Sequence, residues 1–357
     1  MNNKAAEKLR TVLNCIVPVL LAFFVGGIVI LAVGENPFRV YGILIQKSFL
    51  SRTGFLNTLH YAAPLILTGL AIAITFKANI YNMGVEGSLL AGGFAAGIAG
   101  AQLAFLPSFV LKPVCFLIAA GFGILYALLS AVLKVRFRAN EMVVTMMMNY
   151  ALAKVLEYLA TTVFRDTGNG YVCTPAVGDS ATFRRLFGRS RLTLFFFFVL
   201  LILAVMVVVM KRSKLGYEVR AMGRNFEFSE AVGMNVGRTI YKIMILSGAL
   251  AGIAGCGWML ADQYRYTLTF SSNPGLGWDG MLIALLGGHD PIGILVAAVF
   301  YAALKTGADS INMYTNLPKE IVTIIQALLV LFLAVKFIHE HKGWFARRKG
   351  AKAKEES

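Results

Sequence analysis

The feature that most constrains this chain is a series of long apolar runs, each about as long as a membrane-crossing helix. A bilayer core about 30 Å thick requires roughly 20 apolar residues in a crossing helix. Clear runs lie at approximately 13–33, 55–76, 113–133, 142–164, 192–210, 243–261 and 321–338. With two less regular segments the chain offers about ten such runs. The sequence therefore predicts an all-α, polytopic integral membrane protein with about ten transmembrane helices.

Composition and charge agree with a membrane protein and exclude other classes. Of the 357 residues, 58% are hydrophobic and 15% are charged, against roughly 25% charged in soluble domains. The formal net charge of +16 does not indicate nucleic-acid binding, because the Lys and Arg residues cluster in short segments between apolar runs. We therefore predict that the chain is surrounded by membrane lipid and does not bind nucleic acid.

Two regions depart from simple spans. Residues 84–105 carry six glycines and many alanines, a composition that permits either close helix packing or a helix break within the membrane. The apolar run at 280–304 is interrupted at 287–291 by Gly-Gly-His-Asp-Pro. That interruption predicts a short helix and a marginal second one, joined by a turn near the cytoplasmic face.

Basic residues set the predicted orientation. An N-terminus placed inside puts about 21 basic residues in the cytoplasm and about 12 outside. One loop is an exception, because residues 165–191 carry Arg184, Arg185, Arg189 and Arg191 and are predicted to be external. The first apolar run is about twice as long as that of a signal peptide, which favours an uncleaved first helix. We predict cytoplasmic N- and C-termini.

The predicted organisation is one transmembrane domain followed by a short tail. The domain covers residues 1–340 and includes a long polar cytoplasmic loop at 211–242. Residues 341–357 form a polar cytoplasmic tail, as chain termini often do.

The loop at 211–242 has the pattern of a docking segment. Residues 216–225 precede a short predicted helix at 227–232, and Gly233 ends that helix as a glycine stop. The segment resembles the coupling-helix region of ATP-binding-cassette (ABC) importer permeases, where a short helix docks into a groove on the ATPase subunit. The alternative is a solvated amphipathic loop. The resemblance implies that the ATPase-coupling residues are Gly223, Arg224, Asn225, Glu227, Glu230, Ala231, Gly233 and Asn235.

Further stretches resemble the nucleoside and simple-sugar branch of these permeases, which is related to the branched-chain amino acid permeases. The sequence NIYNMGVEG at 79–87 is similar to the branch's F-N-I-G-x-E-G signature, with Tyr81 in place of the usual Phe. NEMV at 140–143 and TMMMNY at 145–150 are similar to its N-E-V and T-x-M-x-N-Y elements. GWDGMLIALLG at 277–287 is similar to a fourth element, G-[FY]-D-G-I-A-V-A-L-L-G. The order of the four matches is that of the family.

This resemblance implies a function and a set of partners. It implies a permease of a bacterial cytoplasmic membrane that pairs with a second permease and with cytoplasmic ATPase subunits. An extracellular solute-binding lipoprotein would deliver a small-molecule substrate, which the permease would carry by alternating access. Nucleosides are the first expected substrates, and simple sugars such as ribose or galactose the second. Met281 and His289 depart from the family pattern and bear on substrate detail.

Polar residues at membrane depth are the candidates for the substrate pathway. A carboxylate at the membrane centre costs about 2.5 kcal/mol or more, so Glu86, Glu141 and Asp279 need partners or water. The predicted pathway residues are Asn79, Asn82, Glu86, Asn140, Glu141, Asn149 and Asp279. In the alternative reading each carboxylate caps a helix end or pairs with a neighbour, and Asn79 and Asn82 end a helix. Lys154 and Glu157, three residues apart, are predicted to form a structural pair.

The sequence lacks the signatures of catalysis. It contains no GxxxxGK[ST] loop, so a partner subunit would have to hydrolyse ATP, and we expect no cofactor in this chain. The four cysteines and four histidines show no metal-ligand or catalytic spacing, and an enzyme is not expected. The rival classes are an ion-coupled secondary transporter, which also uses broken helices and buried carboxylates, and a non-transporting membrane scaffold.

Overall fold

The computed structural model describes residues 20–21, 23–168, 170–268, 274–315, 323–324 and 327–328. The named elements in this part are all helices, with two isolated β-bridges in the loops, so the predicted all-α fold class is confirmed there. The predicted tail at 341–357, most of the run at 321–338 and the start of the first run lie outside the described residues. The chain divides into two compact units, Met1–Phe55 with Ala303–Ser357, and Leu56–Ala302.

The first unit contains the described part of the predicted first helix, and two short elements that sequence reasoning did not assign follow it. An apolar helix, Phe23–Ala32, is followed by α2 (Pro37–Ile45) and a π-helical turn, η1 (Gln46–Leu50). The Asn36 side chain accepts from the backbone N–H of Phe38 and caps α2. The Tyr41 hydroxyl donates to the carbonyl of Phe23 at 2.6 Å, which connects α2 to the preceding helix.

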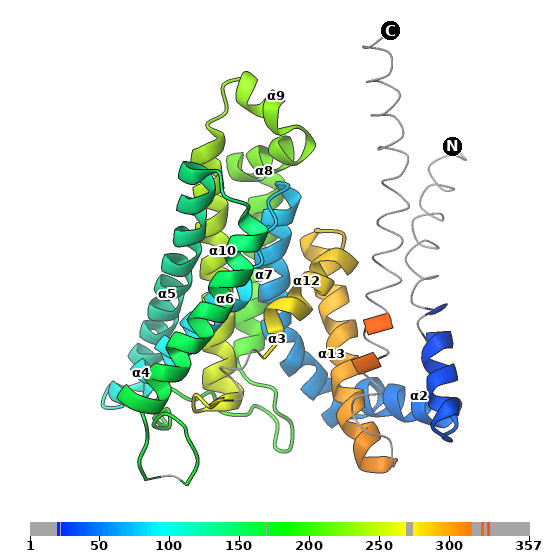
Figure 1. Cartoon of the computed structure of the whole chain (residues 1–357). Coiled ribbons are helices and arrows are strands. Elements are labelled where there is room, and N and C mark those ends of the chain that lie inside the picture. The colour runs from blue at the N-terminus through cyan, green and yellow to red at the C-terminus, as the bar shows by residue number, and fades with distance from the viewer. Residues whose placement is uncertain are drawn as a thin grey trace, which may run out of the picture. The chain divides into compact units, whose positions relative to one another are not determined.

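The second unit holds most of the helices, in the chain order that Figure 1 shows. They are α3 (Arg52–Lys77), α4 (Val85–Gln102), α5 (Ser108–Phe137), α6 (Glu141–Tyr158), η2 (Leu159–Val163), α7 (Phe195–Arg212), α8 (Lys214–Arg224), α9 (Phe226–Ala231), α10 (Val236–Trp258), η3 (Met259–Gln263), α12 (Leu276–Leu286) and α13 (Pro291–Tyr314). Helix α3 begins, and helix α13 ends, in the first unit.

Five helices among the described residues are long and apolar enough to cross a membrane. They are Arg52–Lys77, Ser108–Phe137, Phe195–Arg212, Val236–Gln263 and Pro291–Ile311. The first, second and fourth contain a run predicted from the sequence, and Phe195–Arg212 covers all but the first three residues of the run at 192–210, so hydropathy located these helices correctly. The chain is a multi-pass membrane protein, and the total of about ten spans stays a prediction.

The glycine-rich region at 84–105 forms one continuous helix, so the possibility of a break within it is wrong. A Cβ added at Gly92 would lie 2.6 Å from the Cα of Gly252 on α10, and one at Gly123 of α5 would lie 2.3 Å from the carbonyl oxygen of Gly248. The backbones of α4, α5 and α10 therefore pack against one another with no room for side chains. The close-packing alternative is confirmed.

The predicted break at 287–291 is confirmed, because α12 ends at Leu286 and α13 begins at Pro291. Gly288 and His289 adopt the left-handed conformation there, with φ of 61° and 57°. The second piece is not marginal, however. Helix α13 has 24 residues, because it continues through a polar stretch that hydropathy excluded from the run.

The two long polar segments of the second unit lie at its opposite ends. Figure 1 shows α8 and α9 at one end and the loop that follows α6 at the other. Backbone N–H groups of Val177 and Phe183 donate to the carbonyls of Tyr264 and Leu260, at 2.9 and 3.1 Å, and attach that loop to the end of η3. The arrangement agrees with the prediction that the loops at 211–242 and 165–191 face opposite sides of the membrane.

Candidate functional site

The connection between α3 and α4 carries the first signature motif and is held by buried side chains. Asn79, two residues after the end of α3, has a φ of 60°, which asparagine tolerates. The side-chain amide of Asn82 donates to the hydroxyl of Ser247 on α10 at 3.2 Å, and that hydroxyl donates to the carbonyl of Ala71 on α3 at 2.8 Å. Asn82 therefore connects the motif to two transmembrane helices.

Helix α6 binds the backbone of the same motif. The Thr145 hydroxyl accepts from the backbone N–H of Met83 at 3.1 Å, and the Asn149 side chain donates to the Met83 carbonyl at 2.8 Å. The Asn149 oxygen accepts from the N–H of Gly87 at 3.1 Å and from the Tyr126 hydroxyl at 2.7 Å. The first and third signature elements therefore meet in one hydrogen-bond network.

Glu86 joins the first motif to the fourth. Its buried carboxylate accepts from the backbone N–H of Gly275 at 3.0 Å and from that of Gly277, at the start of α12. The N-terminus of a helix favours a negative charge and leaves N–H groups unsatisfied, so the carboxylate is stabilised there. A Cβ at Gly277 would lie 2.6 Å from Glu86 Oε2, which explains the glycine. This contact is the helix-capping alternative that the sequence left open.

Two further predicted pathway residues make local structural contacts at the start of α6. Glu141 forms an ion pair with Lys134 at 2.6 Å and accepts from the backbone N–H of Tyr81 at 3.4 Å. The Asn140 side chain accepts from the N–H of Met142 at 3.0 Å and caps α6. Hydrogen-bonded partners offset the desolvation cost of a carboxylate at this position.

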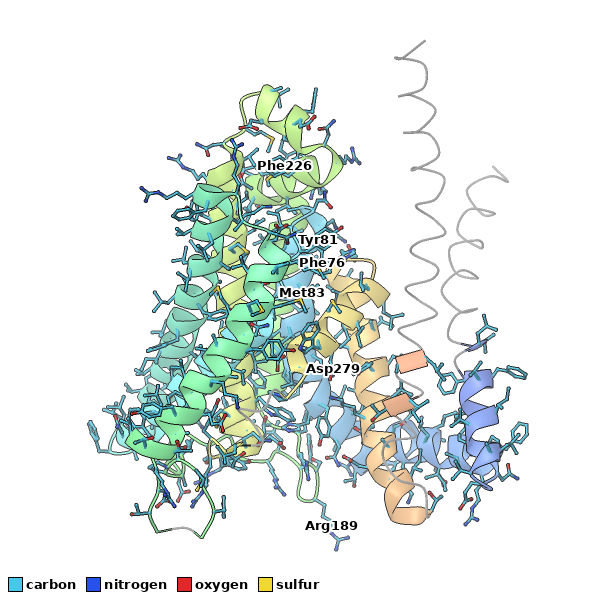
Figure 2. The ribbon with its side chains drawn as sticks, viewed as in Figure 1. Phe76, Tyr81, Met83, Arg189, Phe226 and Asp279 are labelled. Carbon is cyan, nitrogen blue, oxygen red and sulfur yellow. The ribbon has the colours of Figure 1, made fainter. Side chains whose placement is uncertain are left out.

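The side chains of Asp279, Phe76 and Tyr81 are partly exposed. The Tyr301 hydroxyl donates to Asp279 at 2.6 Å, and Asp279 itself is half-buried. The rings of Phe76 and Tyr81 lie 5.2 Å apart edge to face, and Tyr81 is 42% exposed. Figure 2 shows Tyr81, Phe76, Met83 and Asp279 in that order from the α9 end towards the opposite end.

The structure therefore brings Asn79, Asn82, Glu86 and Asn149 together around one short segment, with Asp279 on the helix that Glu86 caps. Glu141 contacts the edge of this segment and Asn140 lies apart, at the start of α6. Their roles in transport stay predictions. Sequence reasoning missed Ser247, Tyr126, Thr145 and Tyr301 as partners of the predicted residues. Of these four, only Thr145 gave a signal, because it stands in the 145–150 element that resembles the family.

The predicted coupling segment is folded as two helices. Ser213 caps α8, and the Asn225 side chain accepts from the N–H of Phe228 at 2.9 Å and caps α9. Gly233 has a φ of 83°, so the predicted short helix with its glycine stop is confirmed. Asn235 accepts from the N–H of Arg238 at 2.9 Å and caps α10. All eight predicted coupling residues, Gly223, Arg224, Asn225, Glu227, Glu230, Ala231, Gly233 and Asn235, are exposed.

A polar and aromatic cluster at the opposite end was not predicted. Asp262 of η3 lies 3.4 Å from His60 of α3 and 3.7 Å from Arg191 of the loop. The His60 ring stacks on Trp258 at a centroid distance of 5.9 Å, and the backbone N–H of Arg191 donates to Asn57 at 2.8 Å. The cluster connects the loop after α6 to α3 and η3.

Two remaining observations complete the chemistry of the described residues. Lys154 and Glu157 form the predicted ion pair at 2.8 Å, on an exposed helix face. Within the described ranges, no three His, Cys, Asp or Glu side chains lie close enough together to hold a metal ion.

Comparison with known proteins places these features in one family. The family model described as branched-chain amino acid transport system / permease component matches residues 54–334. The chain is 31% identical over 350 residues to the guanosine ABC transporter permease protein NupP of Bacillus subtilis, covering 97% of this chain and 99% of the relative. It is 30% identical to the nucleoside ABC transporter permease protein NupB of Lactococcus lactis, covering 95% and 94%. It is also 30% identical to the glucose ABC transporter permease protein TsgB13 of Haloferax volcanii, covering 89% and 86%.

The resemblance found in the signature motifs is confirmed by these matches. The motifs at 79–87, 140–150 and 277–287 and the coupling segment all fall within the matched residues. The chain belongs to the family of branched-chain amino acid transport system permease components.

Proposed function

We propose that this chain is the membrane-spanning permease subunit of an ABC importer that carries nucleosides across a bacterial cytoplasmic membrane. The observation that carries the proposal is its similarity, over 95% or more of its length, to permeases named for guanosine and for nucleosides. Simple sugars are the second candidate substrates, because a permease named for glucose is similar over 89% of the chain. ATP is used by a partner ATPase, and a second permease and an extracellular lipoprotein complete the importer.

The coupling segment is the docking site for the ATPase in this proposal. Phe228 on α9 (63%) and Val232, which follows its last residue (59%), are exposed at one end of the unit, and the same short segment carries the exposed charges of Glu227 and Glu230. An apolar centre with a charged rim is the pattern of a protein interface, in which a few buried side chains supply most of the binding energy. ATP binding would close the ATPase pair and move α9, and the helices would alternate between outward-open and inward-open states.

The orientation follows from the placement of that segment. If α9 meets a cytoplasmic ATPase, the loop at 165–191 faces outwards, because it lies at the opposite end of the unit (Figure 1). About ten helices with both termini in the cytoplasm are consistent with this arrangement.

In this proposal the substrate pathway passes the partly exposed side chains of Tyr81 and Asp279. Aromatic rings stack on nucleobases through their faces, and Phe76 and Tyr81 offer two rings in contact with each other. A carboxylate accepts hydrogen bonds from sugar hydroxyls, a role open to Asp279. Asn82, Glu86 and Asn149 hold the backbone of the segment at 79–87 and the start of α12 in place.

The test of the substrate class is competitive uptake in cells that contain the complete importer. Uptake of radiolabelled guanosine should be inhibited by unlabelled nucleosides and should be insensitive to ribose, galactose and glucose. Tyr81→Ala should raise the KM for guanosine more than Tyr81→Phe, which keeps the ring. Competition by sugars but not by nucleosides would replace the first substrate class with the second.

A further inference from the structure

Helix α8, which precedes the docking helix α9, is packed directly against the end of α3. A Cβ added at Gly223 would lie 1.9 Å from the carbonyl oxygen of Lys77, the last residue of α3. Val219 and Met222 on the same helix are buried. Because interiors are close-packed, α8 cannot shift towards α3 without moving it.

Helix α8 also contacts α10, and this contact is polar and depends on the buried carboxylate of Glu218. Glu218 is 8% exposed, and its Oε2 accepts from the Thr239 hydroxyl on α10 at 3.0 Å. Lys242, also on α10, lies 3.5 Å from the same oxygen, and Lys214 lies 4.0 Å from the other. Such a carboxylate is stable only while its partners stay in place, because loss of a partner leaves a buried charge unpaired.

The contacts of α8 with α3 and with α10 both connect it to the hydrogen bond between Asn82 and Ser247 in the candidate site. The end of α3 continues into the connection that carries Asn82. Ser247, which accepts from Asn82 at 3.2 Å, lies on α10 eight residues after Thr239, about 12 Å along the helix axis. A displacement of α8 would therefore move both the end of α3 and helix α10, the two elements that hold Asn82.

We propose that Glu218 is a positioning residue for transport, which makes α8 and the start of α10 move as one body when the ATPase moves α9. This role rests on the proposed function. The carboxylate connects α8 to α10 through a hydrogen bond from Thr239 and an ion pair with Lys242. A neutral amide keeps the hydroxyl contact and loses the ion pair.

The experiment compares variants of the complete importer reconstituted in proteoliposomes with its ATPase subunits and its binding protein. Glu218→Gln should insert, bind the ATPase and hydrolyse ATP, yet the amount of guanosine moved per ATP should fall roughly tenfold, as for loss of one charged partner of a buried group. Hydrogen exchange of the backbone amides of α8 should accelerate in this variant while that of α5 does not. The matched control is Glu157→Gln, which removes the negative charge of an exposed ion pair on α6. It should change none of these measurements.

A charge exchange separates positioning from a general loss of stability. Lys242→Glu alone should reduce guanosine moved per ATP, and its combination with Glu218→Lys should restore part of it. Unchanged transport per ATP in Glu218→Gln, with normal wild-type uptake, would overturn the role of Glu218 alone. A wild-type complex without ATP-linked uptake would overturn both this role and the proposed function.

Discussion

At the residue scale, the signature glutamate Glu86 acts as a helix cap. Its carboxylate accepts from the backbone N–H groups of Gly275 and Gly277, two donors that would otherwise be unsatisfied at the start of α12. We predict that Glu86→Ala lowers the free energy of unfolding by about 2 kcal/mol, as for loss of a charged hydrogen-bond acceptor, and that Glu86→Gln lowers it less. Thermal unfolding in detergent measures this. Equal melting temperatures for wild type and Glu86→Ala would contradict the capping role.

His289 predicts a pH dependence of stability. Burial, and then the charge of Lys77, lower the pKa of His289 from 6.5 to about 4, and among the described residues its buried Nε2 has no hydrogen-bond partner. The unfolded chain therefore binds a proton near pH 6.5 that the folded chain does not accept until about pH 4. The contribution to stability is present above pH 6.5 and is lost as the pH falls towards 4.

The variant that tests this is His289→Asn, because asparagine tolerates the φ of 57° and does not titrate. Its melting temperature should fall less than that of wild type between pH 7.5 and pH 5. An identical fall in both proteins would show that His289 is accessible to protons in the fold.

At the scale of elements, α9 depends on the glycine stop that follows it. Gly233 has a φ of 83°, and a Cβ added there would meet nothing within 4 Å, so the cost of substitution is conformational and not steric. We predict that Gly233→Val misdirects the chain after α9 and weakens ATPase binding, while Gly233→Asn, which tolerates this conformation, does so much less. Co-purification with the ATPase measures the difference. An equal loss of ATPase binding in both variants would show that position 233 requires a residue without a side chain, and would contradict the conformational explanation.

The loop at the opposite end depends on Asp262. Its carboxylate holds His60 and Arg191 at 3.4 and 3.7 Å, and Arg191 is the last residue of the loop predicted to be external. We expect Asp262→Asn to weaken this attachment and to make the loop more sensitive to protease added outside intact cells. Arg189 of this loop is exposed, and Figure 2 shows it at the end of the unit opposite Phe226. Cleavage at Arg189 from the cytoplasmic side alone would contradict the orientation.

At the scale of the whole molecule, hydropathy predicted the helices and motifs predicted the family, but contacts between distant residues were out of reach. The runs that became α3, α5, α7 and α10 and the break before α13 follow from local composition. Helix α2 was missed because its apolar stretch is too short to give a signal of its own.

The hydrogen-bond partners of the candidate site could not be predicted for a different reason. Asn82 and Ser247 are 165 residues apart, and Glu86 and Gly275 are 189 apart. Each pair forms only once α3, α4, α10 and α12 have packed together. The close packing of α4, α5 and α10 at their glycines is a three-dimensional feature that no local stretch of sequence shows. The sequence therefore identified the polar residues, and the fold supplied the partners that make several of them structural.

The central claim is that the chain moves nucleosides with energy from a partner ATPase. The most direct measurement is uptake of labelled guanosine by proteoliposomes that contain this chain, the second permease and the ATPase subunits, with binding protein on the outside. Uptake should require ATP inside the vesicles, stop when the ATPase carries an inactivating change in its own nucleotide site, and persist when ionophores remove every ion gradient. Uptake that needs no ATPase and disappears with the ion gradient would contradict the account and favour an ion-coupled transporter.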